Sequence, residues 1–233
     1  METVIKIGGS LAMYPSSLRT LCQKLSIYSK KHRITIIPGG GEFADTVRAV
    51  DKRFNLPSNI SHRMAILGMD QYGLMLLELI PNSIDITDID EITKAHDLGK
   101  VPVFLPSKHL FSEDPLENTW DVTSDSIALY TANRLQANKA LLVKDVDGIF
   151  TSDPRKEKWA TLISKITDSK LSTIQQESVD KALSKLLLQW QIDCFVVNGL
   201  FPERIEAILD NREDIYTMIT HSSQDAEALR NKL

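Results

Sequence analysis

Short apolar runs alternate along the chain with longer segments of helical period. The apolar runs contain few alternating polar positions, which is typical of strands covered on both faces. The helical period favours a helix between successive runs, and this order predicts an α/β fold with a largely parallel sheet. The predicted strands are 4–7, 34–37, 84–89, 101–105, 140–143 and 193–197, and the predicted helices are 16–31, 42–54, 61–79, 124–136, 171–191 and 202–210.

One predicted helix is apolar on nearly every side. Between His62 and Ile80, apolar side chains cover almost every direction around the helix axis. A helix of this kind is buried, either in the centre of the monomer or with one face in a subunit interface. We favour the second interpretation, which makes the protein a homo-oligomer.

Composition narrows the class of protein. The chain has 233 residues, 42% of them hydrophobic and 25% charged, with a formal net charge of -4, as expected for a single globular domain spanning 1–233. It has no long basic run, so we expect neither a nucleic-acid nor a membrane partner. Cys22 and Cys194 lie far apart and without metal-site spacing. Met1-Glu2-Thr3 lead directly into an apolar run without a secretory pattern, so we expect a cytoplasmic protein.

The first strand carries a lysine and ends in glycines. It reads Val4-Ile5-Lys6-Ile7-Gly8-Gly9-Ser10. Desolvating an ammonium group is costly unless it meets an anion, which favours a phosphate partner for Lys6. The alternative is an edge strand with a solvated lysine. Glycines let backbone N–H groups approach an anion closely, so this motif predicts a phosphate site.

The second strand runs into three glycines and then a helix. Backbone amides and a helix N-terminus form an anion site after such a strand, at Pro38-Gly39-Gly40-Gly41. The spacing from Gly39 to Ala44 also matches a permissive dinucleotide-binding fingerprint. That fingerprint belongs to the first strand and needs an acidic residue about 20 positions later, so we favour a phosphate or acceptor site.

The third motif, Thr123-Ser124-Asp125, follows a long irregular stretch over 106–121. Loops of that length usually carry function, and we expect this one to close over a site. Hydroxyl and acidic residues at a helix start are ordinary caps. The chemical meaning of the motif therefore depends on its neighbours.

The fourth motif is an acidic turn that follows a strand, over 140–154. Aligning Gly148 with the invariant glycine of a calcium loop puts Val143 and Pro154 at ligand positions, which excludes that type of site. What remains is a strand whose carboxyl end opens into an acidic turn. Open α/β sheets bind ligands at such ends.

In this order, the four motifs resemble the amino acid kinase superfamily, and the resemblance spans nearly the whole chain. It implies a three-layer αβα sandwich with a mostly parallel central sheet and an ATP-dependent phosphotransferase activity. It further implies that about 1–120 bind a small-molecule phosphate acceptor and about 121–233 bind ATP.

The resemblance also assigns roles. Lys6 would contact the transferred phosphoryl group, Asp125 would orient the lysine, and Mg²⁺ would accompany ATP. Many members carry a second lysine after a Gly-Gly-Met run, but 178–183 differs here, which leaves Lys144 and Lys181 as candidates. No residue is assigned as a metal ligand. The expected ATP site comprises Lys6, Gly8, Gly9, Ser10, Lys144, Asp145, Asp147, Gly148, Phe150, Asp153 and Pro154.

Within the superfamily, 61–67, 121–126 and 179–182 are similar to uridylate kinases, but Ser61 and 44–45 depart from their pattern, which argues against UMP itself. The segments 39–45, 65–73 and 194–204 resemble a narrower group, the methanofuran-pathway kinases of (5-(aminomethyl)furan-3-yl)methyl phosphate. As a hypothesis, Asp45 or Asp70 pairs with the acceptor amine and Arg48 or Arg63 with its phosphate. The expected acceptor site comprises Gly39, Gly40, Gly41, Asp45, Arg48, His62, Arg63, Asp70 and Thr123.

Four alternatives remain open at this stage. Two are kinases, namely a uridylate kinase and an enzyme similar to isopentenyl phosphate kinase. The third is a non-catalytic protein that binds a nucleotide or an oxyanion, because a fold does not fix a function. The fourth is a nicotinamide oxidoreductase, based on the 39–44 pattern.

Overall fold

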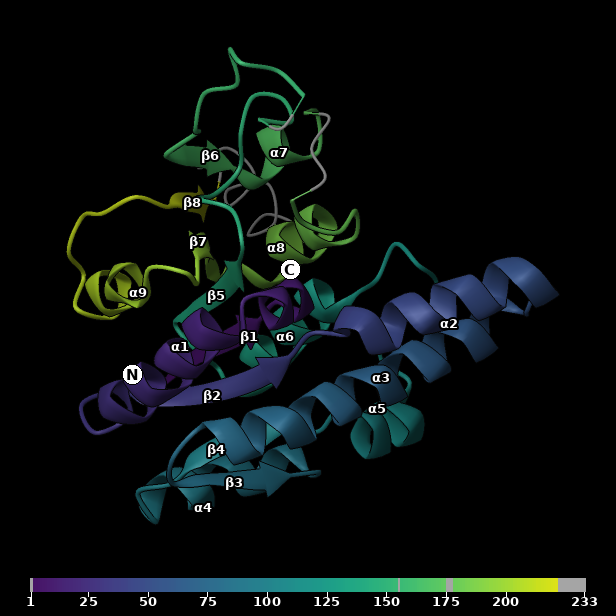
Figure 1. Ribbon diagram of the computed structural model, residues 1–233, viewed down its shortest axis with the longest axis horizontal. Helices are drawn as coiled ribbons and strands as arrows, with labels where there is room; N and C mark the ends of the chain where they lie inside the picture. The colour runs from purple at the N-terminus through teal and green to yellow at the C-terminus, as the bar shows by residue number, and fades with distance from the viewer. Residues whose placement is uncertain (1, 155, 175–177, 222–233) are drawn as a thin grey trace, which may run out of the picture.

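A computed structural model describes residues 2–154, 156–174 and 178–221. Its strands form one sheet of eight strands in the order β3-β4-β2-β1-β5-β7-β8-β6 (Figure 1). Neighbouring strands run parallel except for β7 and β8. The strands are β1 (Glu2–Ile7), β2 (Arg33–Pro38), β3 (Ser83–Ile86), β4 (Val101–Phe104), β5 (Lys139–Lys144), β6 (Lys165–Thr167), β7 (Asp193–Asn198) and β8 (Thr217–Thr220).

Helices cover both faces of the sheet, which confirms the predicted αβα sandwich. Successive residues of a strand point to opposite faces, and in β1 Val4 joins one apolar cluster whereas Ile5 and Ile7 join the other. The first cluster includes side chains of α4, α5, α6 and α8, and the second includes side chains of α1 and α9. The helices are α1 (Pro15–Tyr28), α2 (Gly41–Phe54), α3 (Ser58–Leu79), α4 (Ile92–Asp97), α5 (Ser107–Glu113), α6 (Ser124–Arg134), α7 (Asp168–Leu171), α8 (Leu183–Trp190) and α9 (Pro202–Leu209), with 3-10 turns η1 (Gly9–Met13) and η2 (Ile89–Glu91).

Two sequence-based expectations about elements are wrong. The helix expected over 171–191 is not continuous: α7 ends at Leu171, α8 begins only at Leu183, and Asp180 lies before α8 in a described stretch that is not helical. The irregular stretch over 106–121 contains α5, and the carboxylate of Asp70 accepts the N–H of Ser107 in its first turn at 3.3 Å. Both errors involve contacts between distant parts of the chain, which a local hydrophobic pattern does not record.

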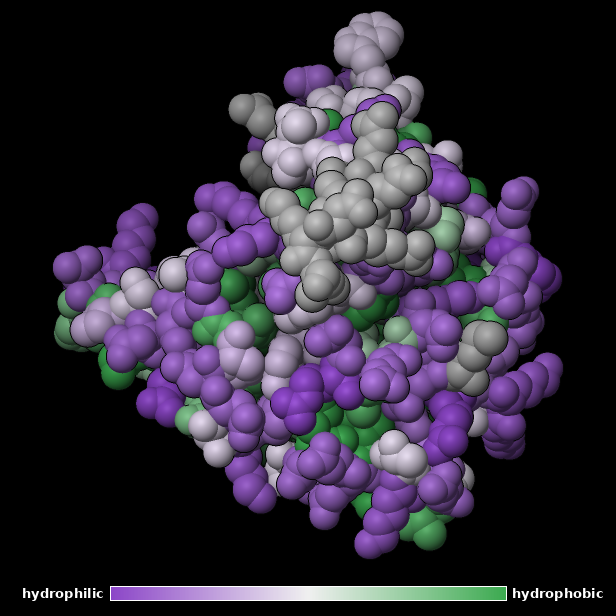
Figure 2. Space-filling model, turned by 180° about the vertical axis from the view of Figure 1, so that it is seen from behind, coloured by the Kyte–Doolittle hydropathy of each residue, from purple (hydrophilic) through white to green (hydrophobic). Residues whose placement is uncertain are grey.

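Helix α3 is only partly buried. Tyr72 and Leu76 lie in the core, whereas Ile60, Leu67 and Leu74 are 42%, 45% and 58% exposed. The three exposed side chains recur every seven residues and therefore lie along one line of the helix. The reverse face of the molecule shows mainly hydrophilic side chains, with apolar ones in a recess between them (Figure 2). The three side chains of the apolar line on α3 are thus only partly covered by the described residues.

Two further features bear on the environment of the chain. Within the described residues, no helix is both long and apolar enough to cross a membrane. Cys22 and Cys194 are buried free thiols, and burial raises the pKa of Cys22 to about 12. Neither thiol has the exposure or the lowered pKa of a reactive cysteine.

Candidate active site

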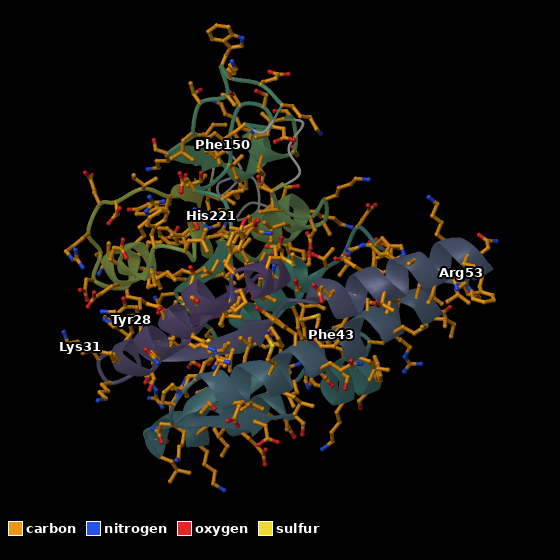
Figure 3. All side chains as sticks on the ribbon, viewed as in Figure 1. Tyr28, Lys31, Phe43, Arg53, Phe150 and His221 are labelled. Carbon is orange, nitrogen blue, oxygen red and sulfur yellow. The ribbon has the colours of Figure 1, made fainter. Side chains whose placement is uncertain are left out.

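The four motifs meet in one cleft of about 1240 Å³ at the carboxyl edge of the sheet. The strands β2, β1 and β5 are neighbours, so the turns that follow them converge at this edge. Figure 3 shows Phe150 in the upper part of the molecule and Phe43 on α2 below it, and the cleft is lined from both of these regions. The predicted residues that line it are Lys6, Gly8, Gly9, Ser10, Gly40, Gly41, Asp45, Arg48, His62, Thr123, Asp125, Lys144, Asp145, Phe150, Asp153 and Pro154.

The two glycine loops touch through their backbones. The N–H of Gly39 donates to the carbonyl of Ile7 at 2.8 Å, and a Cβ added at Gly39 would lie 2.6 Å from the nitrogen of Gly9. A Cβ on Gly9 would overlap the backbone of Gly41, whose φ of +52° also favours glycine. Glycine is thus required for the close approach of the two loops at the cleft.

Two lysines share one carboxylate in the middle of the cleft. Lys6 pairs with Leu142 across the β1–β5 ladder, and Lys144 lies two residues farther along β5, so both lysines project from the same face of the sheet. Asp125, in the first turn of α6, meets them there. Its Oδ1 lies 2.8 Å from Nζ of Lys6 and its Oδ2 accepts from Nζ of Lys144 at 2.7 Å. The side chains of Lys6, Asp125 and Lys144 are 7%, 4% and 15% exposed.

The charges of this triad are fixed by its surroundings. Burial favours the protonated form of Asp125, but Lys144 and Lys6 outweigh burial and hold the pKa of this carboxyl below its usual range. Burial lowers the pKa of Lys6, and the nearby Asp125 opposes that effect. The triad therefore holds one carboxylate between two lysine side chains, an excess of one cationic group at this point of the cleft. Such a charge suits a polyphosphate.

Asp180 is a site residue that the sequence analysis did not assign. Its Oδ2 accepts from the N–H of Thr123 at 2.8 Å and from the N–H of Ser126 at 3.0 Å, and its Oδ1 accepts from the Ser126 hydroxyl at 2.7 Å. The carboxylate therefore caps α6, the helix that carries Asp125. The sequence does show a carboxylate shortly before an apolar helix. It does not show that this carboxylate binds the start of α6, which is distant along the chain.

Lys181 differs from Lys144 in its surroundings. Its side chain is 84% exposed and pairs with the exposed Asp121 at 3.1 Å. It lines the rim of the cleft, whereas Lys144 reaches the buried carboxylate of Asp125. The geometry therefore favours Lys144 as the second phosphate-facing cation.

The side of the cleft formed by α2 and α3 combines a charged rim with apolar walls. Arg48 pairs with Asp45 at 2.9 Å, and its guanidinium lies 4.7 Å from the centre of the Trp120 ring. The indole of Trp120 donates to Asp51 at 2.7 Å, which fixes the ring. The walls behind the rim are formed by Ala65, Ile66, Met69, Val122 and Ile127. The surface suits a small acceptor with an apolar body and charged ends.

Five predicted site residues do not line this cleft. Gly39 packs against the backbone of Ile7 and Gly9, and Asp70, on α3, accepts from the N–H of Ser107 at the start of α5. Asp147 accepts from Asn198 at 2.9 Å and pairs with Arg204, and Gly148 packs against Thr217. Arg63 stacks on Phe111 and lines a separate cavity of about 10 Å³. Asp147 and Gly148 therefore support the acidic turn through contacts on the side away from the cleft.

The side chains offer no closed metal cage. Among the described residues, no group of three or more His, Cys, Asp or Glu side chains could hold a metal ion. Both oxygens of Asp125 already face lysines. Mg²⁺ usually keeps several waters and binds through substrate phosphates plus one or two carboxylates, so this donor set is compatible with an ion that arrives with a nucleotide.

Comparisons with known proteins identify the family of this chain. Residues 1–198 match the Amino acid kinase family. The chain is similar to the (5-(aminomethyl)furan-3-yl)methyl phosphate kinase of Methanocaldococcus jannaschii, with 36% identity over 219 residues that cover 93% of this chain and 96% of that protein. It is also similar to the uridylate kinase of Pyrococcus abyssi, with 28% identity over 190 residues that cover 78% of this chain and 79% of that protein.

The fold agrees as well. The solved structure of a UMP kinase from Ureaplasma parvum superposes with a TM-score of 0.76 at 21% identity, covering 94% of this chain and 98% of that chain. The resemblance predicted from the four motifs is therefore confirmed in sequence and in fold, and with it the expected class of phosphotransferase. The chain belongs to the amino acid kinase family.

Proposed function

We propose that this protein transfers the γ-phosphoryl group of ATP to (5-(aminomethyl)furan-3-yl)methyl phosphate, giving the corresponding diphosphate and ADP. The observation that carries the proposal is the buried Lys6–Asp125–Lys144 triad, which lies in one cleft with both glycine loops. Phosphoryl transfer needs alignment of two anionic substrates and neutralisation of their charge, and the triad supplies both. The choice of acceptor rests on the similarity to the Methanocaldococcus jannaschii kinase.

In this mechanism an oxygen of the acceptor phosphate attacks the γ-phosphorus of ATP in line with the leaving oxygen of ADP. The bond between the γ-phosphorus and that leaving oxygen breaks, and a new phosphoanhydride forms. Lys6 and Lys144 neutralise the transferred group, and Asp125 holds their ammonium groups in place. The attacking phosphate oxygen is already anionic, so the step needs no side chain as general base.

The two halves of the chain serve different substrates in this proposal. The turn that contains Asp145, Phe150, Asp153 and Pro154 lies on the ATP side of the cleft, within 121–233. The residues on the acceptor side belong to 1–120 and are Gly40, Gly41, Arg48 and His62. Mg²⁺ bound to the ATP phosphates would supply further positive charge on this side of the cleft. The reaction takes place in the cytoplasm, where ATP is available.

Two copies of the chain pack through α3 in this proposal. Ile60, Leu67 and Leu74 form an apolar line that is about half exposed on the monomer. Apolar surface of this kind gains free energy when a partner covers it. Gly68 faces α2, where a Cβ would lie 3.2 Å from Cβ of Phe43, so the line lies on a different side of α3 from the contact with α2.

An ADP-release assay with parallel acceptors tests the proposed function. The acceptors are (5-(aminomethyl)furan-3-yl)methyl phosphate, UMP and isopentenyl phosphate, with a reaction lacking acceptor as the blank. We expect the furan substrate to give the highest kcat/KM, and the Lys6→Met variant to lose at least about 100-fold in kcat. Stabilisation by ATP without turnover of any acceptor would indicate a binding protein instead, and stabilisation by NAD but not ATP would indicate an oxidoreductase.

A further inference from the structure

His62 is a buried ring at the acceptor side of the cleft. It lies in the second turn of α3, is 6% exposed and lines the cleft near Ile66 and Trp120. Its Nδ1 lies 3.2 Å from the backbone carbonyl oxygen of Thr119. Because a carbonyl oxygen only accepts hydrogen bonds, Nδ1 carries a proton and donates it to Thr119.

This hydrogen bond determines what Nε2 offers. When the ring is neutral and Nδ1 is protonated, Nε2 carries a lone pair and acts as an acceptor. Burial lowers the pKa of His62, against the opposing effects of the Thr119 hydrogen bond and of Asp114, so the neutral ring is the favoured form at neutral pH. No described residue forms a hydrogen bond with Nε2. A lone pair at that position attracts an N–H group and repels a phosphate oxygen.

The carboxylates on the acceptor side of the cleft are poorly placed to accept a hydrogen bond from an N–H group of the acceptor. Asp45 is 69% exposed and already pairs with Arg48. Asp70 accepts from Ser107 at the start of α5 and does not line the cleft. Glu42 lies on the exposed rim. An acceptor that enters the apolar part of the cleft therefore meets the His62 ring as its buried polar partner.

We propose that Nε2 of His62 accepts a hydrogen bond from the aminomethyl group of the acceptor and thereby selects phosphate monoesters that carry an amine. This inference rests on the proposed function and adds a specificity-determining residue to it. The acceptor would lie with its ring against Ile66 and Trp120, its amine at His62 and its phosphate towards the lysine triad. A primary ammonium is a strong donor, and charge-assisted hydrogen bonds in a buried site are stronger than neutral ones.

Two substitutions of His62 test the roles of Nδ1 and Nε2 separately. His62→Asn places an amide N–H near the position of Nδ1, which preserves a donor towards Thr119 and removes Nε2. His62→Gln reaches the position of Nε2 with an amide oxygen, which preserves an acceptor. The substrates are (5-(aminomethyl)furan-3-yl)methyl phosphate and its analogue (5-methylfuran-3-yl)methyl phosphate, which lacks the amine. Thermal unfolding of each variant reports whether it remains folded.

We expect the wild-type protein to favour the amine substrate over the methyl analogue by about 10- to 100-fold in kcat/KM, as for a hydrogen bond to a charged group. His62→Asn should lose most of this preference through a higher KM for the amine substrate, with the KM for the analogue changed less than about threefold. His62→Gln should recover part of the preference. A purely structural role of His62 would not change one substrate selectively.

Three results would overturn the inference. An equal rise of KM for both substrates in His62→Asn would assign His62 to phosphate binding or to structure. A folded His62→Asn variant that keeps the wild-type preference would show that another group recognises the amine, while the proposed function stands. Absence of wild-type turnover with either furan substrate would refute the proposed function itself and the inference with it.

Discussion

Lys144 donates to Oδ2 of Asp125 at 2.7 Å, while the other oxygen of the same carboxylate lies 2.8 Å from the ammonium of Lys6. Two cations that would repel each other are held side by side by the anion between them. The pair comes from neighbouring strands and the carboxylate from α6, so the arrangement depends on the correct stacking of sheet and helix. A ligand with several negative charges is the natural partner of such a site.

Lys144 and Lys181 should respond differently to the same substitution. Lys144→Met removes a buried ammonium beside the triad carboxylate, and we expect kcat to fall by about 100- to 1,000-fold. Lys181→Met removes a charge from the rim, and we expect less than about a threefold change. Steady-state ADP release at saturating substrates measures both. A larger loss in the Lys181→Met variant would reverse the assignment of the second cation.

Asp125 should matter for stability as well as for activity. Asp125→Asn leaves Lys6 and Lys144 buried without their counter-ion, and breaking a buried ion pair costs about 3–5 kcal/mol in the free energy of unfolding. Asp121→Asn is the matched control because it removes an exposed pairing with Lys181, worth about 1 kcal/mol or less. Urea unfolding curves of the two variants give the comparison. Similar midpoints for both would show that the triad does not stabilise the fold.

The strands illustrate what the sequence predicts well. The runs 4–7, 34–37, 101–105, 140–143 and 193–197 match β1, β2, β4, β5 and β7, because strands buried on both faces are marked by their own apolar residues. The run 84–89 is shorter in the structure, where β3 ends at Ile86 and η2 begins at Ile89. The strands β6 (Lys-Ile-Thr) and β8 (Thr-Met-Ile-Thr) were not predicted because neither forms an apolar run of more than two residues.

The sequence also predicted only some of the side-chain roles in the site. The glycine loops and Lys6 could be predicted because their residue types already indicate an anion site, whereas Asp125 was assigned only through the family resemblance. The roles of Asp70 and Asp180 could not, since each carboxylate acts on a helix start that is distant along the chain. A local pattern shows which side chain carries a charge but not which group it meets.

Asp70 should affect stability rather than acceptor binding. Its carboxylate caps α5 at Ser107, and burial raises the pKa of Asp70 while that contact opposes the rise. We expect Asp70→Asn to lower the free energy of unfolding by about 1 kcal/mol, as for loss of a helix cap. The acceptor KM should stay within twofold of the wild-type value. A selective rise in KM for the amine substrate would restore Asp70 as the partner of the amine.

The apolar line on α3 should control the oligomeric state. A double variant, Leu67→Glu with Leu74→Glu, places two charges on the line, and we expect the dimer to dissociate because buried unpaired charges are costly. Leu98→Glu is the control, since Leu98 is 65% exposed on a different helix end. Light scattering after size exclusion gives the mass of each variant. A monomeric wild-type protein would refute the proposed interface.

Two histidines should make the protein less stable in acid. Burial is the main cause of the lowered pKa values of His62 and His109. The unfolded chain, with histidine pKa values near 6.5, therefore binds more protons than the folded chain as the pH falls through that value. The free energy of unfolding should be highest above this window and decrease below it, by at most about 1.4 kcal/mol per pH unit for each histidine.

Urea unfolding at pH 7.5, 6.5 and 5.5 measures this dependence. The His62→Asn variant should have a flatter profile than the wild-type protein, because one of the two groups no longer titrates. Identical slopes for the two proteins would show that His62 is protonated equally in the folded and unfolded chains.

The cap formed by Asp180 has a consequence for redesign of the cleft. Its carboxylate accepts from the N–H groups of Thr123 and Ser126, so it holds the start of α6 in place from a segment more than 50 residues away. Replacing the segment that carries Asp180 would leave those N–H groups without this acceptor and loosen the helix start that presents Asp125. A change to this loop must therefore supply a new cap if the lysine triad is to keep its geometry.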